Sequence, residues 1–98
     1  MLTACWDGTN ISMTFTWSGV NADAYGFGFT TADGGAGVGL PLPHTEHHGS
    51  IKSLTTDASL FPPLDSLTVV GGVSYHDVSV ASGEISQPTG GWQTLPAC

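Results

Sequence analysis

Three histidines and a glutamate form the densest group of side chains that could bind a metal ion. His44, His47 and His48 surround Glu46 in a short stretch of the chain. Imidazole is the commonest protein ligand for metals such as zinc and nickel, and this spacing can place two rings on one side of a loop. A structural zinc site draws further ligands from elsewhere, and His76 is the one other histidine. We favour the alternative, a solvated polar loop, and expect no cofactor.

A second group contains the residue types of a hydrolytic triad. Ser74, His76 and Asp77 lie close together in the sequence. A working triad is assembled from separate elements, and neighbours on a strand point to opposite faces. This group therefore cannot place a base beside its orienting carboxylate. The chain also lacks a C-x-x-C motif and a glycine-rich phosphate loop before a helix. We expect no catalytic residues and no enzymatic activity.

The two cysteines end matching L-x-A-C motifs near the two ends of the chain. Cys5 and Cys98 are 98 minus 5, or 93, positions apart. One hypothesis is a disulfide, which requires residues 87–98 to fold back along the domain and implies an oxidising compartment. Another is a repeat junction, in which each cysteine marks the same position in successive domains. The third is chance similarity of a short pattern.

Three tryptophans offer a platform for sugar rings if two of them are exposed on one sheet face. Trp17 lies in register with the apolar residues Ile11 and Phe15, which predicts a core position. Trp6 and Trp92 lie near opposite ends of the chain. They either bind a sugar or cover the open edges of the core.

The composition indicates one small, acidic, all-β domain. The chain has 98 residues, one basic residue, eight acidic residues and a net charge of −7. Because a phosphate backbone needs several cations, we expect no binding to nucleic acid or to anionic lipid. No apolar run approaches the roughly 18 residues that span a bilayer, so no membrane insertion is expected, and residues 1–6 lack the features of a signal peptide.

Hydrophobic periodicity places the strands. Residues 11–17 alternate apolar and hydroxyl side chains, which is typical of a strand with one buried face. Residues 25–31 put aromatic rings on one face and glycines on the other, so a neighbouring backbone or bulky side chain is expected against the glycine side. The remaining strands are expected at residues 50–56, 67–70, 73–80 and 92–95.

Turn residues separate these segments. Turns are expected at residues 18–23 and 32–37, and a hydrophobic corner at residues 60–65. Residues 40–49 contain two prolines and are expected to form a loop or a sheet edge, because proline cannot donate to a central ladder. Gly71–Gly72 is either a bulge within one strand or a hairpin turn between two.

The order of these segments resembles a fibronectin type III or related immunoglobulin-like domain. Residues 11–17 and 25–29 look like its second and third strands, and residues 60–64 and 73–81 are similar to its corner and sixth strand, where a tyrosine, here Tyr75, bonds back to the corner. Val78 and Val80 depart from the family's spacing. Either a bulge lies at His76–Asp77 or Tyr75 belongs to a different strand. Strands of this length, separated by glycine, proline and aspartate turns, predict an antiparallel sandwich of two sheets and about seven strands, and the resemblance implies the same fold.

These observations predict a non-catalytic module. It would act as a structural spacer or as an adhesion or display domain of an exported multidomain protein or a virus particle. We expect it outside the cell, at the cell surface or on a virion. Its partners would be other proteins or further copies of itself, met through sheet edges. The alternative is a carbohydrate-binding module of a secreted glycan-active enzyme, which would add glycans to the partners.

Overall fold

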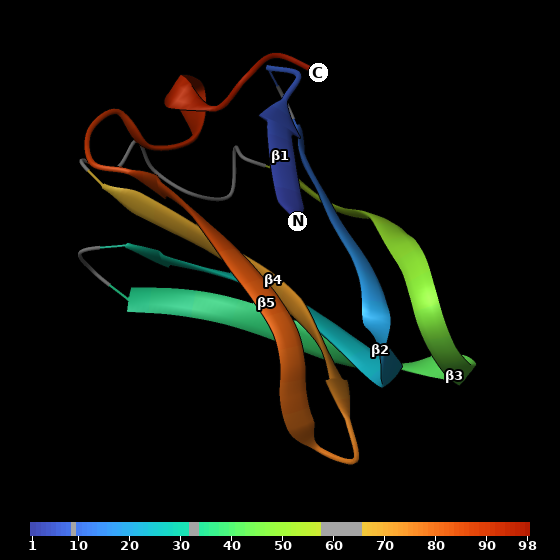
Figure 1. Ribbon diagram of the computed structural model, residues 1–98. Coiled ribbons are helices and arrows are strands. Elements are labelled where there is room, and N and C mark those ends of the chain that lie inside the picture. Colours follow the sequence, from blue (N-terminus) through green and yellow to red (C-terminus); the bar gives the residue numbers. More distant parts are fainter. Residues whose placement is uncertain (9, 32–33, 58–65) are drawn as a thin grey trace.

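The computed structural model describes residues 1–8, 10–31, 34–57 and 66–98. The described strands are antiparallel and form one sheet, which curls into a half-barrel (Figure 1). β2 pairs with β1, β3 and β4, and β4 pairs with β5. The elements in chain order are β1 (Leu2–Trp6), β2 (Asn10–Thr31), β3 (Gly34–Asp57), β4 (Leu67–Tyr75), β5 (Val78–Gln87) and the 3-10 helix η2 (Gly91–Thr94).

The prediction of an all-β, antiparallel fold is confirmed, but the described residues form five strands in one sheet instead of about seven in two. The difference arises because the expected turn at residues 18–23 lies inside β2. The register of β2 against β3 shifts between Ser18 and Ala22 and again between Ala22 and Ala24. Such bulges bend a strand without ending it. β2 and β3 therefore pass round the bend as a pair.

The bend divides the sheet into two halves that face each other across one core. The first half contains β1, residues 10–18 of β2 and residues 48–57 of β3. The second contains residues 24–31 of β2, residues 34–41 of β3, β4 and β5. The core positions predicted for Ile11, Phe15 and Trp17 are confirmed. The buried side chains include Leu2, Ala4, Ile11, Met13, Phe15 and Trp17 from the first half and Phe27, Leu67, Val69 and Val73 from the second.

Two glycines allow the halves to approach. A Cβ atom on Gly71 of β4 would lie 2.8 Å from the Phe27 ring and 2.9 Å from Leu2 Cδ1. On β5, a Cβ atom on Gly83 would lie 3.3 Å from Leu2 Cβ. Gly71–Gly72 is therefore neither a bulge nor a hairpin turn: both residues pair in regular register with β5, and the missing side chain of Gly71 makes room for the core.

The single strand expected at residues 73–80 is wrong, because a hairpin turn at His76–Asp77 divides it between β4 and β5. Both residues have positive φ, 51° and 64°, which is the pattern of a type I′ turn. Tyr75 ends β4 and pairs with Val78, the first residue of β5, so the two belong to different strands. Just before the turn, the register of β4 against β5 shifts between Val73 and Ser74. The turn explains the departure from the expected spacing, because it resets the alternation between the two strands.

Most of the other expected strands are found. Residues 50–56 lie in β3 and residues 67–70 in β4. Residues 40–49 also lie in β3, which pairs with no described strand other than β2, so the sheet-edge alternative is confirmed. The prediction of a strand at residues 92–95 is wrong, because residues 91–94 form the 3-10 helix η2. The expected turn at 32–37 is shorter, since β3 begins at Gly34; residues 32–33 and the expected corner at 60–65 lie outside the described residues.

Candidate binding face

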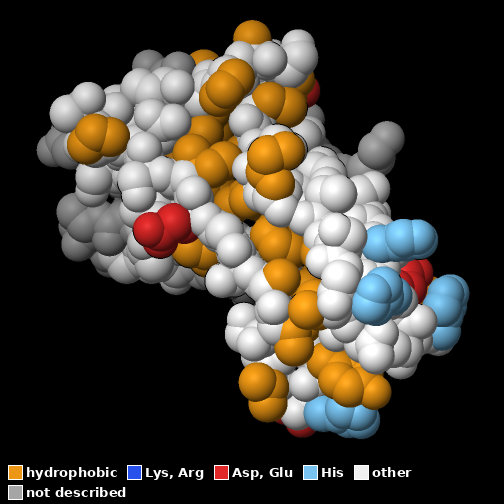
Figure 2. Space-filling view, viewed as in Figure 1, with side chains coloured by type: hydrophobic (Ala, Val, Ile, Leu, Met, Phe, Trp, Pro, Cys, Tyr) orange, Lys and Arg blue, Asp and Glu red, His pale blue; other side chains and the backbone are white. Residues whose placement is uncertain are grey.

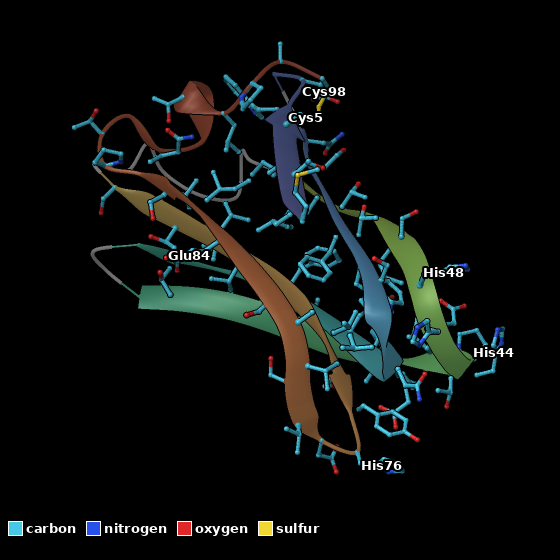
Figure 3. The ribbon with its side chains drawn as sticks, viewed as in Figure 1. Cys5, His44, His48, His76, Glu84 and Cys98 are labelled. Atoms are coloured by element: carbon cyan, nitrogen blue, oxygen red, sulfur yellow. A yellow bond between two sulfur atoms is a disulfide. The ribbon has the colours of Figure 1, made fainter. Side chains whose placement is uncertain are left out.

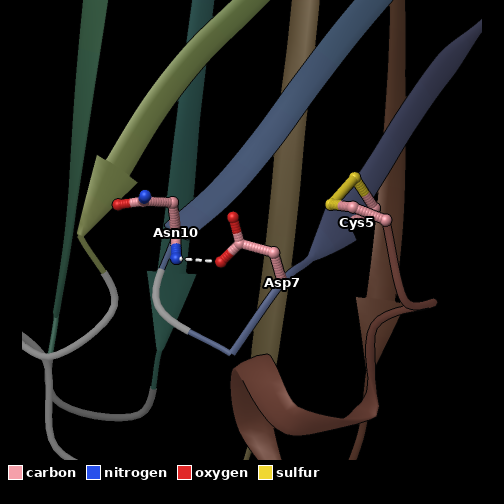
Figure 4. The surroundings of a disulfide bond; sticks show 4 residues. Cys5, Asp7 and Asn10 are labelled. Carbon is pink, nitrogen blue, oxygen red and sulfur yellow. Dashed lines mark hydrogen bonds between the residues drawn. A yellow bond between two sulfur atoms is a disulfide. The ribbon is translucent and has the colours of Figure 1, made fainter.

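A disulfide joins Cys5 to Cys98, with a Cα–Cα distance of 4.9 Å (Figure 4). The end of the chain folds back beside β1, as this hypothesis requires. The Trp6 backbone N–H donates to the Pro96 carbonyl at 2.9 Å, and the Cys98 N–H donates to the Trp6 carbonyl at 3.3 Å. The disulfide is therefore supported over the repeat junction, and it is compatible with an oxidising environment.

The histidines considered as metal ligands meet different partners. His44 Nε2 lies 3.5 Å from Glu46 Oε1, and His47 Nδ1 lies 3.2 Å from Asn21 Oδ1. His48 is exposed on the same strand (Figure 3). Within the described ranges, no three His, Cys, Asp or Glu side chains are arranged to hold one ion. His44, His47 and His48 are therefore exposed polar side chains on the edge strand β3.

The residue types of the triad are also spread over different elements. Ser74 lies in β4, whereas His76 and Asp77 are the two exposed residues of the hairpin turn. The His76 ring packs edge-on against Tyr75, with centroids 4.0 Å apart, and its backbone N–H donates to Asp23 Oδ2 at 3.2 Å. The bond to Asp23 fastens the turn to the bend of β2.

Trp6 and Trp17 both pack in or against the core. Trp17 is buried, and Trp6 is half-buried beside the core cluster. The indole N–H group of each is buried and donates to no atom in the described part of the chain. Neither ring is therefore an open platform for a sugar. The side chain of Trp92 lies outside the described part of the chain.

The second half of the sheet has an unusual outer face, which we call the glycine face. Its outward positions carry glycine on β2, β3 and β4, at Gly26, Gly28, Gly35, Gly37, Gly39 and Gly72. Because successive residues alternate between faces, the core receives Phe27 and Val69, and the outer face receives Gly28 and Val70. Burial agrees, since Val69 is 0% exposed and Val70 is 38% exposed.

The missing side chains leave an open hollow of about 1230 Å³ over the glycine face. Its floor is mostly backbone. Hydroxyl groups line it at Thr30, Ser74, Ser79 and Ser82, and Glu84 supplies the one carboxylate among the described lining residues. Figure 3 shows Glu84 on β5, away from the labelled His44, His48 and His76. This arrangement offers shape and one negative charge, but no group of reactive side chains.

A backbone or a bulky side chain was expected against the glycines of residues 25–31, but the hollow lies over them instead. The atoms nearest a Cβ atom on Gly28 belong to the adjacent strands of the same sheet: the Ala36 carbonyl oxygen at 3.0 Å and Val70 Cγ2 at 3.4 Å. Neither Glu84 nor the hollow was predicted from the sequence. The alternating glycines of residues 35–39 were the available signal, but their pairing with residues 26–28 depends on register.

The two outer strands of the second half, β3 and β5, differ in how readily a further strand could pair with them. β3 carries Pro41 and Pro43, which have no N–H to donate, and then the histidines. β5 has ten residues, no proline and Glu84 as its one charged side chain. Within the described sheet β5 pairs with β4 alone. Long strands without proline or several charges are templates for a further strand, so β5 is the more available edge.

The molecule is polarised along its length. Figure 3 places Cys5 and Cys98 at one pole and His76 at the other. In Figure 2 the histidine side chains gather at the pole away from the disulfide, and a band of hydrophobic side chains crosses the face in view. Both ends of the domain are thus held together, away from the hairpin turn.

The described part of the chain has no helix with the length and hydropathy needed to cross a bilayer. Comparisons with protein-family models, with curated proteins and with solved structures found no match.

Proposed function

We propose that this protein is a non-catalytic display or adhesion module of an exported protein or a virus particle. The observation that supports it best is the Cys5–Cys98 disulfide, which holds both ends of the domain at one pole. A domain fastened there presents its opposite pole and its glycine face to its surroundings. This geometry favours display over an in-line spacer, because a spacer separates the points at which it is attached.

We further propose that the fold is related to the fibronectin type III and immunoglobulin-like sandwiches. The bend gives three strand segments in the first half and four in the second, and three plus four makes seven. The halves contribute to one core, as the two sheets of a sandwich do. In this proposal β2 and β3 each supply one segment to both sheets.

Protein partners are favoured over glycans on the described surface. The aromatic rings of β2 pack on the core side, where Tyr25 and Phe27 form an edge-on pair with centroids 6.1 Å apart. Trp6 is half-buried against the same core. The edge of β5 that pairs with no described strand offers main-chain groups to a neighbouring protein.

A glycan array combined with tryptophan fluorescence tests this proposal against the carbohydrate-binding alternative. We expect no binding on the array and no change in tryptophan emission when soluble glycans are added. Saturable quenching by a glycan would contradict the display proposal and favour the alternative. The protein should be tested in its disulfide-bonded form.

Production in two compartments tests the proposed location. We expect protein exported to an oxidising compartment to form the disulfide and to melt cooperatively at a higher temperature than protein made in a reducing cytosol. Intact mass before and after reduction identifies the bonded form. Full stability of the reduced protein would remove the argument for an exported protein.

A further inference from the structure

We propose that the hollow over the glycine face binds an extended segment of a partner protein that carries lysine or arginine, and that this segment pairs with β5 as an added strand. The inference rests on the proposed function as a display or adhesion module and names the chemistry of its partner. Three features carry it: the glycine floor, the edge of β5 that pairs with no described strand, and the exposed carboxylate of Glu84.

The floor suits a partner that approaches closely. The positions facing the hollow at Gly26, Gly28 and Gly72 have no side chain, so an approaching group can reach the sheet backbone. Glycine in a strand commonly marks such a close approach. The hydroxyls of Ser79 and Ser82 are small enough to leave the same space open on β5. An extended chain that passes beside β5 can therefore turn long side chains into the hollow.

The edge of β5 gives this chain its direction and register. In an antiparallel pair, the main-chain groups of alternate residues point away from the partner strand. Those of β5 that point away from β4 face no other described strand. Strand addition would use them, with affinity from the main chain and specificity from the side chains over the hollow.

The charge of the partner follows from Glu84. Its carboxylate is exposed and contacts no cation in the described part of the chain, and it lies in β5 opposite Val70 of β4. A residue directly across from Glu84 on an added strand would have its Cβ about 5 Å away on the same face, within reach of a lysine or arginine head group. Like charges at that position would repel.

A second copy of this chain fits less well. Each copy has a net charge of −7 and a single cation, Lys52, so two copies repel each other at long range. A basic segment is attracted by the same charge. A glycan would find hydroxyls and Glu84 in the hollow. The rings of Phe27 and Phe29, on which a sugar would stack, pack on the core side.

Peptide binding to the purified, disulfide-bonded protein tests the proposal. The probe is a labelled peptide of the same length as β5 that alternates lysine and threonine, compared with one that alternates glutamate and threonine. By fluorescence anisotropy we expect the lysine peptide to bind and the glutamate peptide not to bind. Binding should weaken as salt is added. Amide hydrogen exchange should slow in residues 78–87 when the lysine peptide is bound.

Matched variants locate the site. We expect Glu84→Gln to weaken binding about two- to fivefold, as for an exposed ion pair, whereas Glu46→Gln removes the same charge far from the hollow and leaves binding unchanged. Ser82→Trp should fill the hollow and abolish binding. Ser86→Trp lies on the same face of β5 outside the hollow and should have little effect. Circular dichroism checks that each variant is folded.

The outcomes separate this inference from the proposed function. Equal losses in Glu84→Gln and Glu46→Gln would mean attraction to the overall charge and would overturn the site. No binding, or binding without protection of residues 78–87, would overturn it too. If no glycan binds either, the display proposal stands without this partner. Quenching by a glycan would instead count against the display proposal.

Discussion

At the scale of single residues, glycine has a different role on each face of the second half of the sheet. Gly71 faces the core and leaves space that Phe27 and Leu2 fill. Gly72, the next residue, faces outward and leaves the hollow open. A Cβ atom on Gly71 would meet the packed side chains of Phe27 and Leu2, which cannot move without disturbing the core. A Cβ atom on Gly72 would instead lie 2.5 Å from the Ala81 carbonyl oxygen of the neighbouring strand β5.

Gly71→Ala should therefore destabilise the fold. We expect the free energy of unfolding to fall by about 1–3 kcal/mol, because a new methyl group overpacks the contact between the two halves. Urea unfolding followed by tryptophan fluorescence measures the change. The control is Gly39→Ala, whose Cβ atom would approach nothing described more closely than the Tyr25 carbonyl oxygen at 3.8 Å. Equal effects of the two substitutions would contradict this account of Gly71.

At the scale of elements, the hairpin between β4 and β5 holds two non-glycine residues at positive φ. His76 and Asp77 have φ of 51° and 64°, a conformation that glycine and asparagine adopt at lower cost. The turn is fastened by the bond from the His76 N–H to Asp23. Within the described part of the chain Asp77 has no such bond to another element, so the two residues differ in what they contribute to the turn.

Asp77→Gly should stabilise the hairpin. We expect a gain of about 0.5–1 kcal/mol, because glycine adopts positive φ without the steric cost of a Cβ atom. Asp77→Val should destabilise, since a β-branched residue is disfavoured there. Thermal unfolding of both variants gives the comparison. A loss of stability in Asp77→Gly would show that the aspartate side chain supports the turn.

How far the sequence predicts these elements depends on the range of the interactions involved. The alternation of residues 11–17 identifies a strand and its buried face, because side-chain direction is a local property. The bend at residues 18–23 has the composition of a turn, yet pairing with β3 keeps the chain extended. Turn composition says nothing about a partner strand distant in sequence.

The candidate site shows the same limit. The histidines were visible as a group in sequence, but the side chains of His44 and His47 meet different residues. Glu84 stood out in no motif, and its position over the hollow follows from the register of β5 on β4 and of β4 on β2. A face assembled from four strand segments becomes apparent only when all the pairings are known.

At the scale of the whole molecule, the disulfide closes almost the entire chain. We expect the double variant Cys5→Ser with Cys98→Ser to lose about 4–5 kcal/mol of stability, the chain-entropy value for a loop of this length. Urea unfolding under non-reducing conditions measures it. Wild-type protein treated with reductant should match the variant. A much smaller loss would mean that the fold is held by the sheet and core alone.

The disulfide also determines how the domain would carry tension. A pull applied at residues 5 and 98 would pass through the covalent sulfur bond and bypass the sheet, so β2 to β5 would stay unloaded. Force spectroscopy through handles at the two ends should record no extension from the domain until reductant is added, and a full unfolding step afterwards. The bond thus makes the length of the tether independent of whether the domain is folded.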